Sequence, residues 1–288
     1  MKQADINRRE FMKVAGAAAG LAAVAPMVSA AAQETLKGKI KTAVGYDMIK
    51  EGGSPLEKLN LIKALGIAGV ELSVGSKVDH DELRKAADAT GVTVHGIVHG
   101  WSLDKIPESI DLAKKLGADS VLVAVPQVKE DFAYDEAYTK SQAAYREVIP
   151  YAEKQQVSLL LETVWNNFLL SPMEMARYID EMNSPWFQAY FDIGNMLRYG
   201  WSDQWIRILG KRVKKIHLKD YSRKKLESEG LWKGFDCEIG EGSNDWAAVR
   251  KALLEIGYQG WATAEVGGGD KARMVQLAGQ MNKVLALE

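Results

Sequence analysis

The strongest constraint on the fold is an alternation of short apolar runs with longer helical patterns from residue 40 onward. The runs are rich in Val, Ile, Leu and Ala without polar alternation, as expected of strands buried on both faces. We place eight strands at residues 40–46, 69–74, 92–98, 120–125, 157–163, 188–193, 213–219 and 261–266. Eight strand–helix units without a break in composition predict an α/β protein, a single-domain (β/α)8 TIM barrel over residues 33–288.

The segments between the strands carry helix signals. Ser54 and Pro55 begin one helical pattern and Gly66 ends it. The main alternative, a doubly wound open sheet, requires a glycine-rich phosphate turn after the first strand, which residues 44–47 do not supply. The one long connection, residues 223–244, follows the seventh strand, and we expect it to cover the active site.

Composition narrows the function classes. The chain has 37 Lys and Arg against 38 Asp and Glu, and therefore lacks the basic surplus that nucleic-acid binding requires. Its single cysteine, Cys237, excludes an intramolecular disulfide and a cysteine-based zinc cluster. We expect a small-molecule partner and no nucleic acid; self-association into a homo-oligomer stays open.

The N-terminal segment indicates export. Arg8 and Arg9 precede Phe11, Met12 and Lys13, and a small, weakly apolar run with small-residue cleavage sites follows. This pattern resembles a twin-arginine (Tat) signal peptide over residues 1–32, which implies the twin-arginine export machinery and a periplasmic location. An amphipathic helix would need a polar face, which the run lacks. The run is too short and too poor in Leu and Ile for stable membrane insertion.

Four consecutive strands in the second half of the chain each end near an ionisable residue. Each alone could be an ordinary strand-end charge that faces water. Three carboxylates and one imidazole at the same mouth would repel one another unless a divalent cation neutralised them. Oxygen-rich ligation with one nitrogen suits Mn²⁺, our leading candidate, and leaves Mg²⁺, Co²⁺, Fe²⁺ and Zn²⁺ open. The four candidates are Glu162, Asp192, His217 and Glu265.

The motifs around these residues resemble a known family. It is the xylose-isomerase-like superfamily of sugar (phosphate) isomerases and epimerases, and the likeness spans the whole chain after the signal. The resemblance implies one divalent metal ion bound by the four candidates, with Glu162 and Glu265 also serving as the catalytic acid/base pair. The motifs are Leu161-Glu162-Thr163, Phe191-Asp192-Ile193-Gly194-Asn195, Ile216-His217-Leu218-Lys219-Asp220 and Ala264-Glu265-Val266.

The implied reaction is metal-assisted proton transfer next to a carbonyl of a sugar or polyol. A base and an acid would work on opposite faces of one carbon while the metal stabilises the enediolate. Several ketose epimerases carry a His where this chain has Asn195, and a Glu where it has Phe168. Two alternatives therefore stay open: a dehydratase or lyase acting on a keto-sugar or keto-inositol, and a non-catalytic sugar-binding barrel.

Further residues are candidates for substrate binding. Arg223 matches an arginine that many family members aim at substrate oxygens, although a solvated charged loop is the alternative. Glu71 could instead neutralise Arg84 or Lys77, and Lys219 could support Asp220. The triglycine at 267–269 precedes Asp270, which favours a helix cap over a phosphate site. The substrate-binding candidates are Arg223, His99, Glu71, Asn195, Lys219 and Trp101.

Overall fold

The computed structural model describes residues 35–288. The predicted signal peptide, residues 1–32, lies outside the described residues. Among the residues that are described, no helix is long and apolar enough to cross a membrane.

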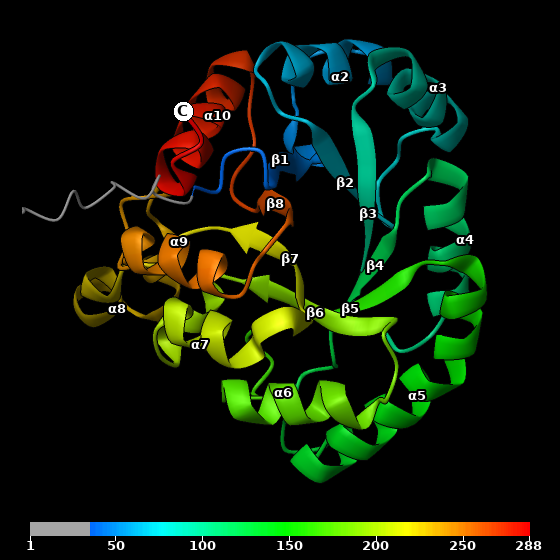
Figure 1. Cartoon of the computed structure of the whole chain (residues 1–288), viewed down its shortest axis with the longest axis vertical. Helices are drawn as coiled ribbons and strands as arrows, with labels where there is room; N and C mark the ends of the chain where they lie inside the picture. Colours follow the sequence, from blue (N-terminus) through cyan, green and yellow to red (C-terminus); the bar gives the residue numbers. More distant parts are fainter. Residues whose placement is uncertain (1–34) are drawn as a thin grey trace, which may run out of the picture. The chain divides into compact units, whose positions relative to one another are not determined.

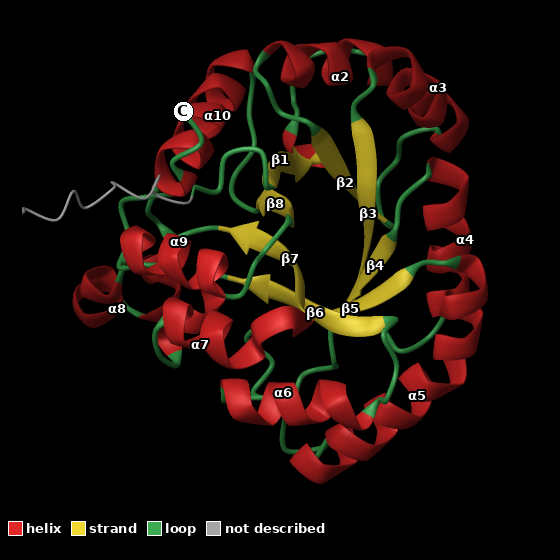
Figure 2. Cartoon of the chain, viewed as in Figure 1, coloured by secondary structure: helices red, strands yellow, loops and turns green. Residues whose placement is uncertain are grey.

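Eight parallel strands close into a barrel in chain order, β1 to β8, with helices outside it (Figures 1 and 2). The predicted (β/α)8 fold is confirmed, and each predicted strand overlaps an observed one with ends that differ by two residues at most. The strands are β1 Ile40–Gly45, β2 Gly69–Ser73, β3 Thr93–Gly100, β4 Ser120–Val123, β5 Ser158–Glu162, β6 Phe187–Asp192, β7 Val213–Leu218 and β8 Gly260–Ala264.

Polar side chains cap the first turn of several helices. The Ser54 hydroxyl accepts from the Glu57 N–H at the start of one helix, and Asp270 caps the last helix by accepting from the Arg273 N–H. The helices are α2 Pro55–Ala64, α3 His80–Thr90, α4 Ile106–Leu116, α5 Tyr134–Gln155, α6 Pro172–Glu181, α7 Ser202–Leu209, α8 Arg223–Glu229, α9 Trp246–Glu255 and α10 Lys271–Leu285.

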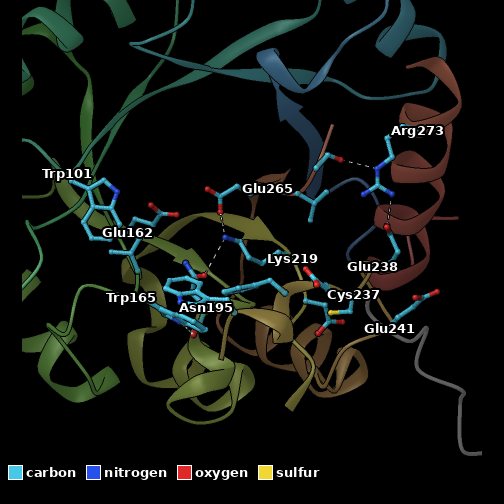
Figure 3. Close-up of a pocket in the computed structure, with 17 residues that line it drawn as sticks. Trp101, Glu162, Trp165, Asn195, Lys219, Cys237, Glu238, Glu241, Glu265 and Arg273 are labelled. Carbon is cyan, nitrogen blue, oxygen red and sulfur yellow. Dashed lines mark hydrogen bonds and ion pairs between the residues drawn. The ribbon is translucent and has the colours of Figure 1, made fainter. Parts of the chain in front are cut away.

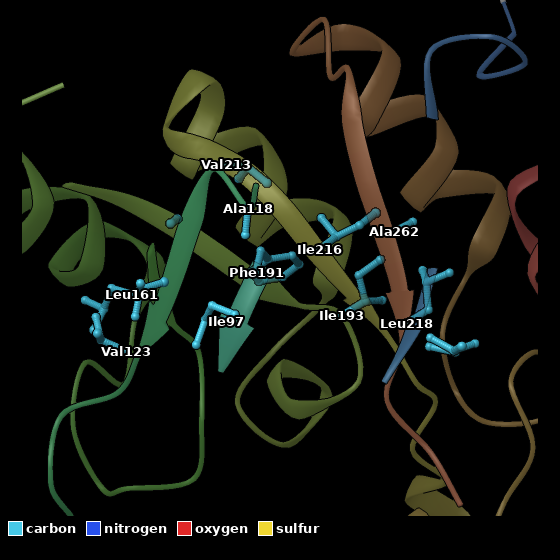
Figure 4. Packing of buried hydrophobic residues seen from close by; sticks show 14 of the residues in the cluster. Ile97, Ala118, Val123, Leu161, Phe191, Ile193, Val213, Ile216, Leu218 and Ala262 are labelled. Carbon is cyan, nitrogen blue, oxygen red and sulfur yellow. The ribbon is translucent and has the colours of Figure 1, made fainter. Parts of the chain in front are cut away.

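The two faces of the strands differ in chemistry. The outward-facing residues are apolar and pack beneath the helices, as Phe191, Ile216 and Ala262 do in Figure 4. Because side chains alternate along a strand, their neighbours Tyr190, Lys215 and Thr263 point into the barrel. All three are buried, and with His95 they form a polar network inside the barrel, next to the apolar Leu122 and Leu160. Polar groups in that position must be hydrogen-bonded to one another.

The segment between β7 and α9 is fixed to the barrel by one carboxylate. Asp220 accepts hydrogen bonds from Gly240 N at 3.1 Å, Asn244 Nδ2 at 3.1 Å and Trp246 Nε1 at 3.0 Å. The segment folds into α8 and a short 3-10 helix, η4 (Leu231–Phe235). The loop predicted to cover the mouth is therefore ordered by bonds to the end of β7.

Candidate active site

The four predicted ligands converge at the C-terminal mouth of the barrel. Each offers one ligand atom, and these atoms all lie within 4.8 Å of one another. His217 Nδ1 lies 2.8 Å from Glu162 Oε1, 3.4 Å from Glu265 Oε2 and 3.8 Å from Asp192 Oδ2. Residues from four separate strand ends thus form a single cluster.

Strand register explains the convergence. Asp192 on β6 pairs with His217 on β7, and His217 pairs with Thr263 on β8. Glu162 on β5 pairs with Tyr190, two residues before Asp192. Glu265 follows Thr263 by two residues and therefore points to the same side. Parallel pairing brings these strand ends to one level, as the active sites of such barrels require.

A buried lysine lies among the carboxylates. Lys219 Nζ is 2.5 Å from Glu265 Oε2 and 3.2 Å from Asp192 Oδ2. Burial alone would lower the pKa of Lys219, but the negative charges of Asp192 and Glu265 outweigh it and raise that pKa. The ammonium group therefore stays charged and partly neutralises the cluster.

The carboxyl groups differ in acidity because their surroundings differ. Burial raises the pKa of Asp192 to about 7 against the opposing charge of Lys219. Burial and the charge of Glu265 raise the pKa of Glu162. For Glu265, burial is outweighed by the positive charges of His217 and Lys219, which lower its pKa to about 2. Glu265 is thus held ionised, while Glu162 is biased toward protonation.

One carboxylate oxygen of the cluster lies beside a cation, 3.2 Å from Lys219 Nζ, but makes no hydrogen bond. Asp192 is fully buried, and its Oδ2 makes no hydrogen bond. A buried carboxylate oxygen without a hydrogen bond is costly unless a charge lies beside it. Three carboxylates and an imidazole are also the hard, mostly oxygen donor set that suits Mn²⁺, Mg²⁺, Co²⁺ or Fe²⁺. The residues present therefore fit a divalent cation.

A second carboxylate lies behind the histidine. His217 Nε2 is 2.9 Å from Glu71 Oε2, and Tyr190 donates its hydroxyl to Glu71 Oε1 at 2.5 Å. Burial would lower the pKa of His217, but the charges of Glu265 and Glu71 and the bonds to Glu162 and Glu71 raise it well above its usual value. Glu71 therefore orients the ring from inside the barrel, whereas Arg84, a partner considered for Glu71, is paired with Asp88.

The cluster opens into a cavity of about 660 Å³. Aromatic side chains form part of its wall: Trp165 lies 4.7 Å from Phe235 and 5.1 Å from Trp232, ring centre to ring centre. Figure 3 shows Trp101 and Trp165 toward one end of the cavity and Arg273 toward the other. Acid/base groups on the floor and apolar faces on the wall suit a polyhydroxylated ligand with C–H faces.

A family model described as the xylose isomerase-like TIM barrel matches residues 59–283. The chain belongs to this family. Among curated proteins, L-ribulose-5-phosphate 3-epimerase UlaE of Salmonella paratyphi A is 26% identical over 233 residues, which are 71% of this chain and 79% of that protein. The family membership predicted from the four motifs is confirmed.

Solved structures agree on the fold. An L-ribulose 3-epimerase aligns with a TM-score of 0.70 and 18% identity over 86% of this chain and 95% of its own. The structure described as the probable 3-DHS dehydratase AsbF of Bacillus anthracis aligns with a TM-score of 0.68 and 13% identity over 84% and 98%. The UlaE protein and the L-ribulose 3-epimerase are both named as epimerases, and epimerases are isomerases.

Three of the predicted substrate-binding residues line the cavity of this chain: Trp101, Asn195 and Lys219. Asn195 donates from Nδ2 to Thr163 O at 2.8 Å, which fixes its amide beside Lys219. Lys219 contacts Asp192 and Glu265 as described, and no contact with Asp220 is seen among the described residues.

Arg223 and His99 are placed away from the cavity lining. Arg223 donates from Nε and Nη2 to Leu197 O at 3.0 and 2.9 Å, and from Nη2 to Gly200 O. His99 Nδ1 lies 2.7 Å from Ser109 Oγ, and its Nε2 donates to Ser102 O at 3.1 Å. Arg223 Nε and Nη2 and both ring nitrogens of His99 are thus engaged within the fold, and the structure does not place either residue at the cavity where substrate contacts were expected.

Other features of the cavity were not anticipated from the sequence. Phe168, which stands where several ketose epimerases carry a Glu, is buried against Tyr134 and Tyr138 in the core. Arg273 on α10 lines the cavity and donates to Glu238 at 2.6 Å. Glu238 belongs to the long loop singled out in the sequence, whereas Arg273 had no motif of its own that could have indicated it.

Proposed function

We propose that this chain is a divalent-metal-dependent sugar epimerase or isomerase that transfers a proton at a carbon next to a carbonyl. One observation supports this above all: four ligand atoms from four strand ends lie within 4.8 Å of one another on the floor of an open cavity. Membership of the family and the epimerase activity named for its relatives agree with it.

The metal would be held by Glu162, Asp192, His217 and Glu265. When bound, a divalent ion supplies a Lewis acid that polarises the carbonyl and stabilises the negative charge left by proton removal. We take Mn²⁺ as the first ion to test, because three oxygen donors and one nitrogen match its preferences.

The two glutamates would move the proton. One of them would take the proton from one face of the reacting carbon, and the other would return a proton to the opposite face. Reversing these roles carries the reaction in the opposite direction. Lys219 contributes by keeping a positive charge 2.5 Å from Glu265.

The metal part of the proposal is tested by metal content. The purified wild-type chain, loaded with Mn²⁺ and desalted, is expected to retain about one ion per chain. The Glu162→Ala/Glu265→Ala double variant, which loses two of four ligands, is expected to retain almost none. Equal and negligible metal in both proteins would refute the metal site.

Elimination is the second candidate, since a structural neighbour is described as a dehydratase. Both reactions begin with the same proton abstraction, and only the fate of the resulting anion differs. Product analysis separates them: epimerisation preserves the mass of the sugar, whereas elimination releases one molecule of water. The complete ligand cluster favours either reaction over a binding-only barrel, for which ionised Glu265 would have no role.

We also propose export by the twin-arginine route, with residues 1–32 removed. The support is the sequence pattern of Arg8, Arg9, Phe11 and Lys13 before a small apolar run. A fusion of residues 1–40 to a reporter should reach the periplasm, and an Arg8→Lys/Arg9→Lys variant should stay inside. Unchanged export of that variant would point to a different route.

A further inference from the structure

The cavity extends well beyond the groups that would do the chemistry. Its volume of about 660 Å³ exceeds the roughly 200 Å³ that one hexose needs on a scale where a water takes about 30 Å³. In Figure 3, Lys219 and Glu265 lie between Trp101 and Trp165 at one end and Glu238 and Arg273 at the other. A single sugar at the cluster would leave much of this space filled only by water.

The charges around the cavity disfavour a phosphate group. Only two cationic residues line it, Lys219 and Arg273, counted over the described part of the chain. Lys219 is paired with Asp192 and Glu265, and Arg273 donates to Glu238 at 2.6 Å and to Gly267 O at 3.0 Å. The acidic residues of the lining are Glu162, Asp220, Asp236, Glu238, Glu241 and Glu265. A phosphate monoester with nearly two negative charges would meet net repulsion here.

The usual phosphate position of such barrels is closed in this chain. It lies in the loops after β7 and β8, where a helix N-terminus offers free N–H groups. Here the N-terminus of α10 is already capped: Asp270 Oδ1 accepts from the Arg273 N–H at 3.1 Å, and Glu51 Oε2 accepts from the Lys271 N–H at 2.7 Å. Two carboxylates thus occupy the donors that a phosphate would use.

The rim of the cavity instead presents aromatic faces. Trp232 is 69% exposed and Trp101 is 46% exposed, yet both line the cavity. Trp232 lies on η4 and contacts Trp165, so it prolongs the aromatic wall outward from the catalytic floor. Exposed apolar surface of this kind marks a binding surface, and an indole face fits the C–H face of a sugar ring.

Resting on the proposed function, we propose that the substrate is an uncharged glycosylated keto-sugar. The keto-sugar residue would react at Glu162 and Glu265. The second sugar residue would pack on Trp232 and Trp165. A phosphorylated substrate would instead need cationic side chains at this position to bind its phosphate. The relatives named for L-ribulose 5-phosphate would then differ from this chain in substrate class.

Three probes that share one ketose test the proposal: D-fructose, D-fructose 6-phosphate and isomaltulose, which carry a hydroxyl, a phosphate and a glucosyl group at the same oxygen. Quenching of tryptophan fluorescence in the Mn²⁺-loaded full chain ranks their binding without turnover, and deuterium uptake from deuterated water reports the reaction. We expect isomaltulose to bind about tenfold more tightly than D-fructose, and D-fructose 6-phosphate to bind more weakly than both.

The outcomes separate the two proposals. Tightest binding of D-fructose 6-phosphate, or equal binding of isomaltulose and D-fructose, would overturn the substrate class even if deuterium is taken up. Absence of deuterium uptake with the expected binding order would contradict the proposed reaction and leave the binding class standing.

A matched pair of tryptophan variants locates the second sugar. Trp232→Ala should lower the preference for isomaltulose, taken as the ratio of its binding constant to that of D-fructose, by about tenfold. Trp201→Ala removes a comparably exposed indole that does not line the cavity, and it should leave the ratio unchanged. An unchanged ratio in Trp232→Ala would remove the second sugar from this wall.

Discussion

His217 and Glu71 form a hydrogen bond of 2.9 Å between Nε2 and Oε2 on the side of the imidazole that faces away from the carboxylate cluster. With a metal bound, the bond from Nε2 to Glu71 would favour the tautomer in which Nε2 carries the hydrogen. The Nδ1 lone pair, which faces Glu162 at 2.8 Å in this structure, would then bind the metal. Glu71 is thus a positioning residue for the ligand atom of His217 that faces Glu162.

Glu71→Gln should weaken metal binding without removing a ligand. Loss of such an outer carboxylate typically costs about 10–100-fold in metal affinity. Titration of the metal-free protein with Mn²⁺ measures the effect, and a circular dichroism spectrum checks that the barrel stays folded. Tyr190→Phe, which removes the 2.5 Å donor to Glu71, should show a smaller loss in the same direction. A Glu71→Gln protein with wild-type affinity would exclude the positioning role.

Single replacements of the acid/base pair should slow turnover more than they impair folding. Glu162→Gln and Glu265→Gln each remove a group that accepts or returns the proton, so kcat should fall by about 10²–10⁴-fold. Glu227→Gln on α8, an exposed site outside the cavity lining, is the control and should retain full activity. If either cavity variant kept wild-type kcat, its glutamate would not be the proton carrier.

Replacement of Arg223 should affect stability rather than substrate binding. Its guanidinium holds two backbone carbonyls, Leu197 O and Gly200 O, and stacks 5.0 Å from Trp201. Arg223→Ala should lower the free energy of unfolding by about 1–2 kcal/mol, because these carbonyls lose a charged donor. Denaturant unfolding measures this change. A tenfold loss of kcat/KM at unchanged stability would instead restore the substrate contact suggested by the sequence.

The lone cysteine should react slowly at neutral pH. Burial, reinforced by the charge of Asp220, raises the pKa of Cys237 to about 11. Only the thiolate reacts, so alkylation at pH 8 should be far slower than for a free thiol with a pKa of about 8.5, and should rise about tenfold per pH unit up to pH 10. Because Cys237 lines the cavity, a bound sugar should slow the alkylation of Cys237 further. Rapid alkylation at pH 7 would contradict the burial of this thiol.

The fold and the ligand cluster could be predicted because both depend on local patterns. Apolar runs define the strands, and an ionisable residue at the end of each of four consecutive strands must point into the same mouth. The bond between Glu71 and His217 joins residues 146 positions apart across the barrel, and no spacing in the sequence indicates it. The partners of Arg223 could not be predicted for a related reason: they are backbone carbonyls, which the identity of the residues does not indicate.

Solvent exchange tests the central claim, proton transfer by Glu162 and Glu265 beside a bound metal, most directly. The Mn²⁺-loaded chain is incubated in deuterated water with a panel of ketoses and glycosyl-ketoses, and each sugar is then analysed by NMR and mass spectrometry. At least one sugar should gain a single deuterium on the carbon next to its carbonyl. That gain should disappear in Glu265→Gln and after metal removal with a chelator, and return when Mn²⁺ is restored. A fully loaded wild-type protein that exchanges no proton on any sugar of the panel would contradict the account.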